Sequence, residues 1–542
     1  MAPILRSSFT FALSTVLILF FSVSSSTSST TFAIASNNSS QGVFSVKYRY
    51  AGRERSLSTL KAHDSRRQLR ILSGVDLPLG GSGRPDGVGL YYAKIGIGTP
   101  SKDYYVQVDT GSDLMWVNCI QCKGCPTSSS LGIELTLYNI KASSTGQLVS
   151  CESQFCYEVS GGRLPGCQPN ITCPYLEIYG DGSSTAGYFV KDVVQYDKVS
   201  GDLQTTSSNG SVMFGCGYSQ SGDLDSSNED ALDGILGFGK SNSSMISQLA
   251  STGKVKKMFA HCLDGTNGGG IFAIGHVVQP VVNMTPLVPN QPHYNVNVTT
   301  IQVGHDFLNL PKDLFEAGDR KGTLIDSGTT LAYLPEIVYG PLVDKILSWQ
   351  PDLQVHTIHD DYTCFQYSGS VDDGFPNVTL HFENSVSLRV YPHDYLFYFK
   401  RKKKGKNPGH KVRHLRRGWE KARCMQLYPC IAKRLFLGIY KKKEGLWCIG
   451  WQNSGMQSKD RRNLTLLGDL VLSNKLVLYD LENQVIGWTE YNCSSSIKVR
   501  DEQTGTVHLV GSHTISSARN LIMRWTTILL LLLMYASMNS IY

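Results

Sequence analysis

The chain carries the same short acidic motif twice, at Asp109-Thr110-Gly111-Ser112 and at Asp326-Ser327-Gly328-Thr329. Each copy follows a run of β-forming residues, 105–108 before the first and 323–325 before the second. A carboxylate at the end of a strand, followed by glycine in a tight turn, is held on rigid backbone. Two such carboxylates facing each other would share one proton, because like charges a few ångströms apart cannot both ionise. Such a pair can activate a water as a base and protonate a leaving amine as an acid.

A glycine-containing hairpin sequence lies between the two acidic motifs, at residues 179–183 and 185–189. A mobile hairpin can close over a peptide and exclude water, although an ordinary hairpin with a glycine in its loop has the same signature. Two hydrophobic-hydrophobic-Gly segments, 234–237 and 466–469, and a tryptophan, Trp116, complete the set of motifs. In combination they are far more specific than any one of them alone.

Over residues 88–493 these motifs resemble the pepsin-like aspartic proteases. The resemblance implies an all-β fold of two lobes with a deep cleft between them, in which Asp109 and Asp326 are the catalytic residues, one from each lobe. It implies hydrolysis of peptide bonds in a protein or peptide substrate by general acid–base catalysis, with no cofactor or metal. The residues implied around the substrate are Ser112, Thr329, Trp116, Tyr179 and Gly180.

Each of these five residues has an implied role in the family. Ser112 and Thr329 would hydrogen-bond the two carboxylates, Tyr179 and Gly180 would form the flap, and Trp116 would support Tyr179. For Trp116, packing in the core is an equally ordinary role.

Fourteen cysteines point to an oxidising compartment. Twelve lie in the region of resemblance, at positions 119, 122, 125, 151, 156, 167, 173, 216, 262, 364, 448 and 493. The spacing Cys119-x-x-Cys122-x-x-Cys125 could suggest zinc, but matching histidines are missing from the sequence pattern. The cluster 119–173 resembles the cysteine-rich insert of the atypical, nepenthesin-like plant enzymes, and the resemblance implies a bond between Cys364 and Cys448. The remaining connectivity stays open.

The first 85 residues are predicted to form two segments that precede the two lobes. Residues 1–29 have the charge and apolar run of a secretory signal peptide, or alternatively of a signal anchor. Residues 30–85 are predicted to be a propeptide, basic and partly helical in pattern over 42–80, or else a plain solvated charge run. The N-terminal lobe would then cover residues 86–290 and the C-terminal lobe 291–495.

Residues 496–542 are predicted to be a linker and a GPI-anchor signal, since small residues precede a terminal apolar tail. A short tail anchor is the alternative. We therefore expect a monomer on the extracellular face of the plasma membrane, held by a lipid, with no nucleic-acid partner. The sequence also holds ten Asn-X-Ser/Thr sites that suit a secreted glycoprotein, at Asn37, Asn38, Asn170, Asn209, Asn242, Asn283, Asn297, Asn377, Asn463 and Asn492.

Residues 400–443 do not fit the resemblance. They hold 17 Lys and Arg residues against one acid, Glu420, a net charge of +16. Because the whole chain carries +7, the remainder carries −9, which suits an enzyme that works at low pH. The segment is interpreted as translated intron sequence or a lineage-specific loop, and the resemblance implies that it enters at a turn between strands.

Two other functional classes stay open. One is a protease-like inhibitor or cell-wall binding protein, because plants use this fold for inhibitors of wall-degrading enzymes. The other is a structural wall glycoprotein. Intact acidic motifs and an intact Tyr179 favour the enzyme.

Overall fold

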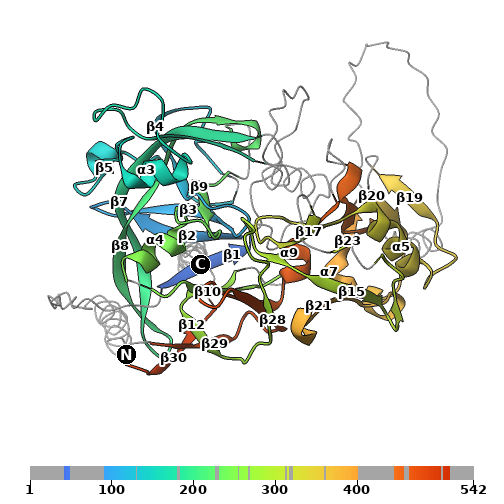
Figure 1. Ribbon diagram of the computed structural model, residues 1–542. Helices are drawn as coiled ribbons and strands as arrows, with labels where there is room; N and C mark the ends of the chain where they lie inside the picture. The colour runs from blue at the N-terminus through green and yellow to red at the C-terminus, as the bar shows by residue number, and fades with distance from the viewer. Residues whose placement is uncertain are drawn as a thin grey trace, which may run out of the picture. The chain divides into compact units, whose positions relative to one another are not determined.

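The computed structural model describes residues 42–48, 91–129, 131–179, 183–225, 231–253, 255–265, 269–311, 314–315, 321–358, 362–400, 445–456, 463–501 and 504–512. Within these residues strands predominate, which confirms the predicted all-β class (Figure 1).

One large sheet joins the first half of the chain to its end. Its strand order is β13-β28-β27-β10-β11-β1-β2-β3-β9-β4-β8-β7-β5, and β6 pairs with β7. The strands are β1 (Gly42–Tyr48), β2 (Tyr91–Ile97), β3 (Lys102–Asp109), β4 (Trp116–Lys123), β5 (Gln147–Leu148), β6 (Pro174–Ile178), β7 (Ser184–Gly201), β8 (Gln204–Ser221), β9 (Gly234–Gly237), β10 (Met258–Leu263), β11 (Gly270–Ile274), β13 (Met284–Pro286), β27 (Lys475–Asp480) and β28 (Val485–Glu490). The pairing of β10 with β27 links the two halves, with Ala260 opposite Leu478.

The second half adds three smaller sheets. One has the order β14-β17-β26-β18-β25, another β16-β15-β21-β22, and the third β19-β20-β24-β23. Their strands are β14 (Asn295–Val296), β15 (Val298–Val303), β16 (Asp306–Phe307), β17 (Lys321–Ile325), β18 (Ala332–Leu334), β19 (Val355–Ile358), β20 (Tyr362–Phe365), β21 (Val378–Phe382), β22 (Ser387–Val390), β23 (Leu396–Lys400), β24 (Gly445–Ile449), β25 (Trp451–Asn453) and β26 (Asn463–Leu467). A last sheet, β12-β29-β30, consists of β12 (His276–Gln279), β29 (Ser496–Arg500) and β30 (Val507–Gly511).

The helices are short and sit between strands. They are α3 (Gln154–Val159), α4 (Met245–Ser251), α5 (Glu336–Leu347), α6 (Val371–Gly374), α7 (Pro392–Tyr395), α9 (Asp469–Leu472) and the 3₁₀ turns η2 (Ile140–Ala142), η3 (Gly222–Leu224), η4 (Glu383–Ser385) and η5 (Ser454–Met456). In two of them the hydroxyl of an N-cap serine accepts a backbone N–H: Ser153 accepts that of Cys156 in α3, and Ser244 accepts that of Ser247 in α4. These caps satisfy backbone donors that a helix start leaves unpaired.

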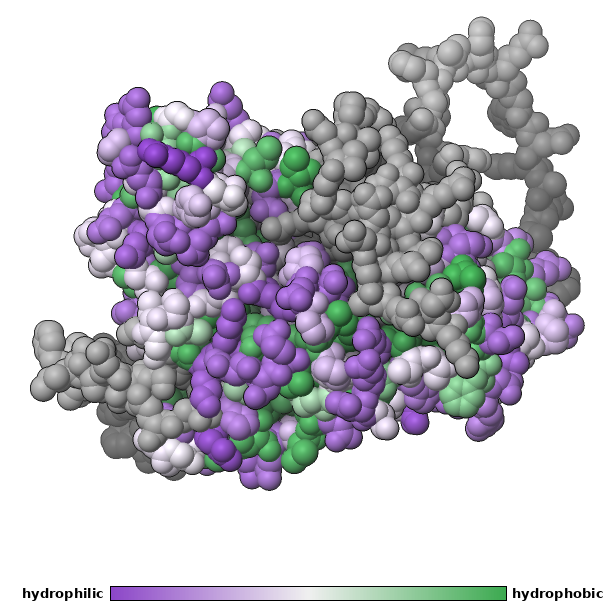
Figure 2. Space-filling view, in the orientation of Figure 1, coloured by the Kyte–Doolittle hydropathy of each residue, from purple (hydrophilic) through white to green (hydrophobic). Residues whose placement is uncertain are grey.

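Apolar side chains from both halves share one core. Val106 and Phe238 from the first half, Leu324 from the second and Tyr479 from the end of the chain belong to the same buried cluster. On the face shown in Figure 2, the described surface is mixed, with apolar patches separated by hydrophilic side chains. The shared core ties the strands that carry the two acidic motifs to each other.

Six disulfides use all twelve cysteines of the region of resemblance. They are Cys119–Cys216, Cys122–Cys125, Cys151–Cys167, Cys156–Cys173, Cys262–Cys493 and Cys364–Cys448. The predicted use of these cysteines in disulfides is therefore confirmed, and so is the bond Cys364–Cys448. Cys424 and Cys430 lie outside the described residues.

Residues 42–48, inside the predicted propeptide, form strand β1 rather than a helix. This strand lies between β11 and β2 in the large sheet, with Phe44 opposite Phe272 and Lys47 opposite Tyr92. Backbone pairing on both sides explains the extended conformation, because each strand edge supplies a ladder of hydrogen bonds.

The strands on either side of the basic segment pair directly. Lys400 at the end of β23 is opposite Gly445 at the start of β24. The segment therefore enters the fold at the end of a hairpin, as the resemblance implies, and residues 401–443 themselves lie outside the described residues.

Two of the predictions concern the ends of the chain. The predicted signal peptide, residues 1–29, and residues 513–542, which include the apolar part of the predicted GPI-anchor signal, lie outside the described residues. No helix within the described ranges is both long and apolar enough to cross a membrane.

Candidate active site

The first acidic turn closes on its own carboxylate. Asp109 is the last residue of β3 and its side chain is buried. The backbone N–H of Gly111 donates to Asp109 Oδ1 at 2.8 Å, and the Ser112 hydroxyl donates to Oδ2. Both oxygens of the carboxylate are thus held by groups within three residues of it.

The second acidic turn repeats this arrangement. Asp326 follows β17 directly and is also buried. The N–H of Gly328 donates to Asp326 Oδ1 at 2.7 Å, and the Thr329 hydroxyl donates to Oδ2 at 2.7 Å. The repeated sequence motif therefore gives a repeated hydrogen-bond pattern.

Each turn is backed by one of the hydrophobic-hydrophobic-Gly segments. Strand β9 runs parallel to β3, with Gly237 beside Asp109, and β26 runs parallel to β17, with Leu467 beside Ile325. The N–H of Phe238 donates to the carbonyl of Asp109 at 2.7 Å. These two segments therefore pack directly against the acidic turns.

The two turns contact each other through a crossed pair of hydrogen bonds. The N–H of Ser327 donates to Thr110 Oγ1 at 2.9 Å, and the N–H of Thr110 donates to Ser327 Oγ at 3.3 Å. A Cβ placed on Gly111 would lie 2.5 Å from the carboxylate carbon of Asp326. Glycine is therefore required at this position, because any side chain there would occupy the space that the second carboxylate fills.

Trp116 and Tyr179 lie together at the predicted flap. Residues 174–178 and 184 onward pair as a hairpin, and the Tyr179 N–H donates to the carbonyl of Ser183 at 2.8 Å. The indole N–H of Trp116 donates to the phenolic oxygen of Tyr179 at 2.7 Å, and both side chains are buried. Gly180, the other predicted flap residue, lies outside the described residues.

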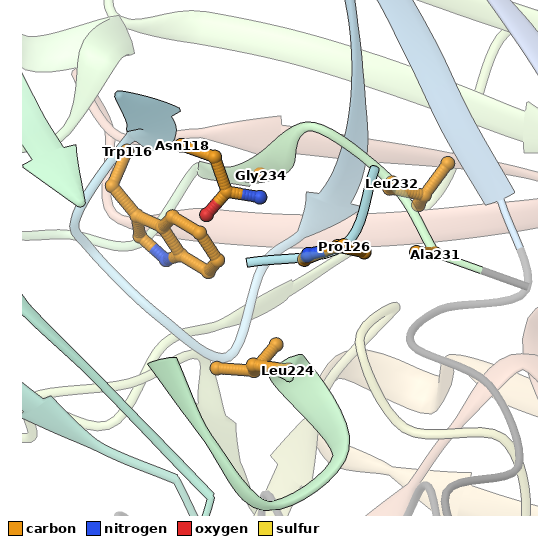
Figure 3. A pocket seen from close by; sticks show the side chains of 7 residues that line it. All are labelled: Trp116, Asn118, Pro126, Leu224, Ala231, Leu232 and Gly234. Carbon is orange, nitrogen blue, oxygen red and sulfur yellow. The ribbon is translucent and has the colours of Figure 1, made fainter. Parts of the chain in front are cut away.

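A small cavity adjoins Trp116. It measures about 10 Å³ and is lined by Trp116, Asn118, Pro126, Leu224, Ala231, Leu232 and Gly234 (Figure 3). This is room for about one water molecule. The side chain of Asn118 offers it a polar group beside otherwise largely apolar walls.

A buried polar pair that sequence reasoning missed lies beneath the first turn. Tyr479 of β27 and His261 of β10 are both buried, and His261 Nε2 lies 3.0 Å from the Tyr479 phenolic oxygen. The ring of Tyr294 meets that of Tyr479 edge-on at 4.7 Å, and Tyr294 donates to the carbonyl of Phe238, just beyond the strand behind the first turn. Burial lowers the pKa of His261 to about 3 and raises that of Tyr479 far above its usual value.

The cysteine spacing that could suggest zinc serves disulfides instead. Cys122 bonds Cys125, and Cys119 bonds Cys216. Throughout the part of the chain that the structure describes, no group of three or more His, Cys, Asp and Glu side chains is arranged to hold a metal ion.

The comparisons with known proteins agree with this geometry. Residues 91–276 match the family model described as xylanase inhibitor N-terminal, and residues 293–404 match the one described as xylanase inhibitor C-terminal. Aspartic proteinase 36 of Arabidopsis thaliana is 46% identical over 489 residues, which cover 90% of this chain and 92% of the relative. This chain belongs to the plant family of pepsin-like aspartic proteases.

A second member of the family from Arabidopsis thaliana, Aspartic proteinase 39, is 44% identical over 481 residues, 89% of this chain and 90% of the relative. The crystal structure of conglutin gamma, a basic 7S globulin from lupine seeds, superposes with a TM-score of 0.54 at 18% identity, covering 84% of this chain and 96% of the globulin. The predicted two-lobed fold of the pepsin-like aspartic proteases is thus confirmed. At 18% identity, the likeness to the globulin is evidence for the fold alone.

Proposed function

We propose that the protein is an endopeptidase that hydrolyses peptide bonds at acid pH, with Asp109 and Asp326 as its catalytic pair. The observation that carries the proposal is the crossed pair of hydrogen bonds between Thr110 and Ser327. These bonds fasten the two turns to each other, so that the carboxylates belong to one site. Two family members of similar length are aspartic proteinases, which supports the same reaction class.

The mechanism follows from two carboxylates that share one proton. The ionised carboxylate takes a proton from a water molecule, whose oxygen attacks the carbonyl carbon of the substrate. The protonated carboxyl gives its proton to the carbonyl oxygen, and the resulting tetrahedral diol loses its amine when that nitrogen is protonated. No bond forms between enzyme and substrate. Ser112 and Thr329 keep each carboxylate in orientation.

Tyr179 would close over the bound peptide, with Gly180 giving the hairpin its freedom to move. The hydrogen bond from Trp116 supports this role, because it fixes the ring of Tyr179 at the base of the hairpin. Protein or peptide segments are the substrates, taken by a monomer without cofactor.

We further propose that the chain enters the secretory pathway and stays on the outer face of the plasma membrane by a GPI anchor. Six disulfides support an oxidising compartment. The terminal apolar sequence supports the lipid anchor. Phosphatidylinositol-specific phospholipase C should release the protein from cells. Release only on deletion of residues 520–542 would indicate a peptide anchor.

A second candidate function is binding without catalysis, as an inhibitor of wall-degrading enzymes or a wall protein. The description of the matched family models as xylanase inhibitor domains favours it.

Cleavage of a denatured protein separates these candidates. The purified chain, activated at acid pH, should cut denatured substrate fastest in acid and lose activity towards neutral pH, because the pair must keep one proton. The same preparation is assayed for inhibition of a xylanase. Inhibition without proteolysis at any pH would establish the binding function, and a maximum above neutral pH would exclude the paired-carboxylate mechanism.

A further inference from the structure

We propose that a pocket beside β15 and β21 holds an N-linked glycan attached to Asn377, with its first sugar packed on Trp349. The pocket has a volume of about 450 Å³, and its lining includes Gln302, Trp349, Asn377, Thr379, His381 and Arg389. The inference does not depend on the proposed catalysis. It rests on the proposed secretory route, in which glycans are attached to Asn-X-Ser/Thr sites.

One of the ten Asn-X-Ser/Thr sites of the sequence, Asn377-Val378-Thr379, lies at this pocket. Asn377 directly precedes β21, and Thr379 lies on β21 opposite Gln302 of β15. Asn377 is half-buried and is one of the residues that line the pocket. A glycan on Asn377 would therefore begin at the pocket wall.

An exposed aromatic ring lies beside this asparagine. Trp349 comes just after the end of α5, a helix that lies against β15, and it is 45% exposed (Figure 1). The N–H of Gly304 donates to the carbonyl of Asn377 at 2.9 Å. A Cβ placed on Gly304 would lie 2.7 Å from Cζ2 of Trp349. Trp349 and Asn377 therefore flank the same glycine.

Polar side chains form the rest of the pocket wall. Gln302 Nε2 donates to the carbonyl of Gly304 at 3.0 Å, and Gln302 Oε1 accepts from His381 Nε2 at 3.1 Å. Asp373 and Arg389 are exposed and also line the pocket. Carboxylate and guanidinium groups hydrogen-bond the hydroxyl and acetamido groups of a sugar. The pocket thus combines one aromatic ring with several polar groups.

A pyranose ring has the surface that such a pocket can bind. Its C–H groups form an apolar face that packs on the electron-rich face of an indole, and its hydroxyl groups need hydrogen-bonding partners. One such contact binds a free sugar only weakly. Attachment to Asn377 gives the sugar an effective concentration on the order of millimolar at the pocket, which raises the occupancy of a weak contact. The occupant that this favours is the chain's own glycan.

Resistance of the glycan to enzymatic removal tests the proposal on the full, folded protein. Peptide mass spectrometry measures the glycans at Asn377 and Asn209 before and after a peptide N-glycosidase is added without denaturant. Asn209 is the control, because it is exposed on β8, opposite Gln195 of β7. Release at Asn377 should be at least about tenfold slower than at Asn209, since the packed sugar must first leave the pocket. Denaturation should abolish the difference.

Two variants of Trp349 test whether the ring is responsible. Trp349→Leu keeps an apolar side chain without the flat ring, and it should speed release at Asn377 about tenfold while leaving release at Asn209 unchanged. Trp349→Tyr keeps a flat ring and should keep release slow. If Trp349→Leu folds but leaves release at Asn377 unchanged, the indole does not hold the glycan and the proposal is wrong.

Thermal unfolding gives a second, independent measurement. Asn377→Gln should lower the melting temperature by about 2 °C more in the wild-type background than in Trp349→Leu, because the glycan stabilises the fold through the ring. Asn209→Gln should have the same effect in both backgrounds. Equal effects of Asn377→Gln in both backgrounds would contradict the proposed contact.

The wild-type protein alone can also overturn the proposal. A secreted protein without a glycan at Asn377 would do so, and so would equal release at Asn377 and Asn209, which is expected if the pocket takes a free saccharide instead. This comparison still decides if Trp349→Leu cannot be purified folded. A protein that cleaves nothing but protects its Asn377 glycan supports the inference while the catalytic proposal fails. An active protease with an unprotected glycan refutes the inference alone.

Discussion

The two aspartate turns are built alike, whereas the halves of the chain that carry them are stabilised differently. In each turn a glycine N–H and a hydroxyl three residues after the aspartate hold the carboxylate. Each turn also has a parallel strand behind it. The local geometry therefore comes from the short repeated motif and its backing strand.

The surroundings of the two turns differ between the two halves of the chain. Four disulfides lie between Cys119 and Cys216 in the first half, while one, Cys364–Cys448, closes a hairpin region of the second half. The second half instead receives the basic segment at the end of the β23–β24 hairpin. The two turns therefore have the same local geometry although the disulfides and loops around them differ.

The largest expected effect is at the glycines that allow each backing segment to approach its turn. A Cβ on Gly237 would collide with the backbone of Asp113 and Leu114, and one on Gly468 with the carbonyl oxygen of Thr329. Gly237→Ala and Gly468→Ala should each cost at least about 3 kcal/mol and abolish secretion of folded protein.

Gly340→Ala is the control for these two variants. Gly340 lies inside α5, and a Cβ there would meet only the end of the Glu336 side chain at 3.9 Å. This change should raise the melting temperature slightly, because alanine favours a helix over glycine. If only one of the variants Gly237→Ala and Gly468→Ala loses yield and stability, the two turns are not built equivalently.

The next effect concerns pH and the junction between the halves. His261 binds a proton in the unfolded chain below about pH 6.5 but in the folded protein only near pH 3. Because the folded pKa of this base is depressed, its contribution to stability is present above pH 6.5 and is lost as the pH falls towards 3.

His261→Gln isolates this contribution. Between pH 7 and pH 3.5 the wild type should lose about 4 kcal/mol more unfolding free energy than the variant, as 1.36 kcal/mol per pKa unit requires. Denaturant melts at the two pH values give the difference. Identical acid sensitivity in both proteins would mean that His261 is already charged, or exposed to water, in the folded state.

A smaller effect is expected at the two hydroxyls that hold the carboxylates. Ser112→Ala and Thr329→Val should each lower kcat by about tenfold to a hundredfold, since each removes one oriented donor from a carboxylate oxygen. Ser112→Thr and Thr329→Ser keep the donor and should retain most activity. If kcat falls by very different factors in Ser112→Ala and Thr329→Val, the two turns are not equivalent in function, contrary to what their matching hydrogen bonds indicate.

The smallest effect is expected from the basic segment. Lys400 and Gly445 are directly opposite each other, so an Asn-Gly turn in place of residues 401–444 should close the hairpin. The shortened protein should cleave denatured substrate within about twofold of the full chain, because a long loop at a hairpin end contributes little to the lobe. Yield and melting temperature are compared in the same host. An inactive or unfolded short form would make the segment an integral part of the second half.

Much of the site could be predicted from the sequence because its parts are local. The carboxylate, the glycine and the hydroxyl of each turn lie within four residues, and strands β3 and β17 were indicated by β-forming runs before Asp109 and Asp326. The bond Cys364–Cys448 followed from the resemblance alone.

The remainder depends on contacts between distant parts of the chain. His261 and Tyr479 lie 218 residues apart in two largely hydrophobic strands, and no local pattern marks them as partners. The crossed bonds of Thr110 and Ser327 required the two turns to be seen together. The strand at residues 42–48 was missed because its conformation comes from the sheet on both sides, not from its own composition.

The central claim is that Asp109 and Asp326 act as one unit, and a double-mutant cycle on cleavage of denatured protein at acid pH tests it most directly. Asp109→Asn, Asp326→Asn and the double variant are purified, their fold is checked by thermal unfolding, and kcat is measured for each. We predict that each single change removes activity by at least about a thousandfold and that the double change adds nothing further, because residues that act as a unit are not additive. Substantial activity in either folded single variant, or losses that multiply in the double variant, would contradict the shared site.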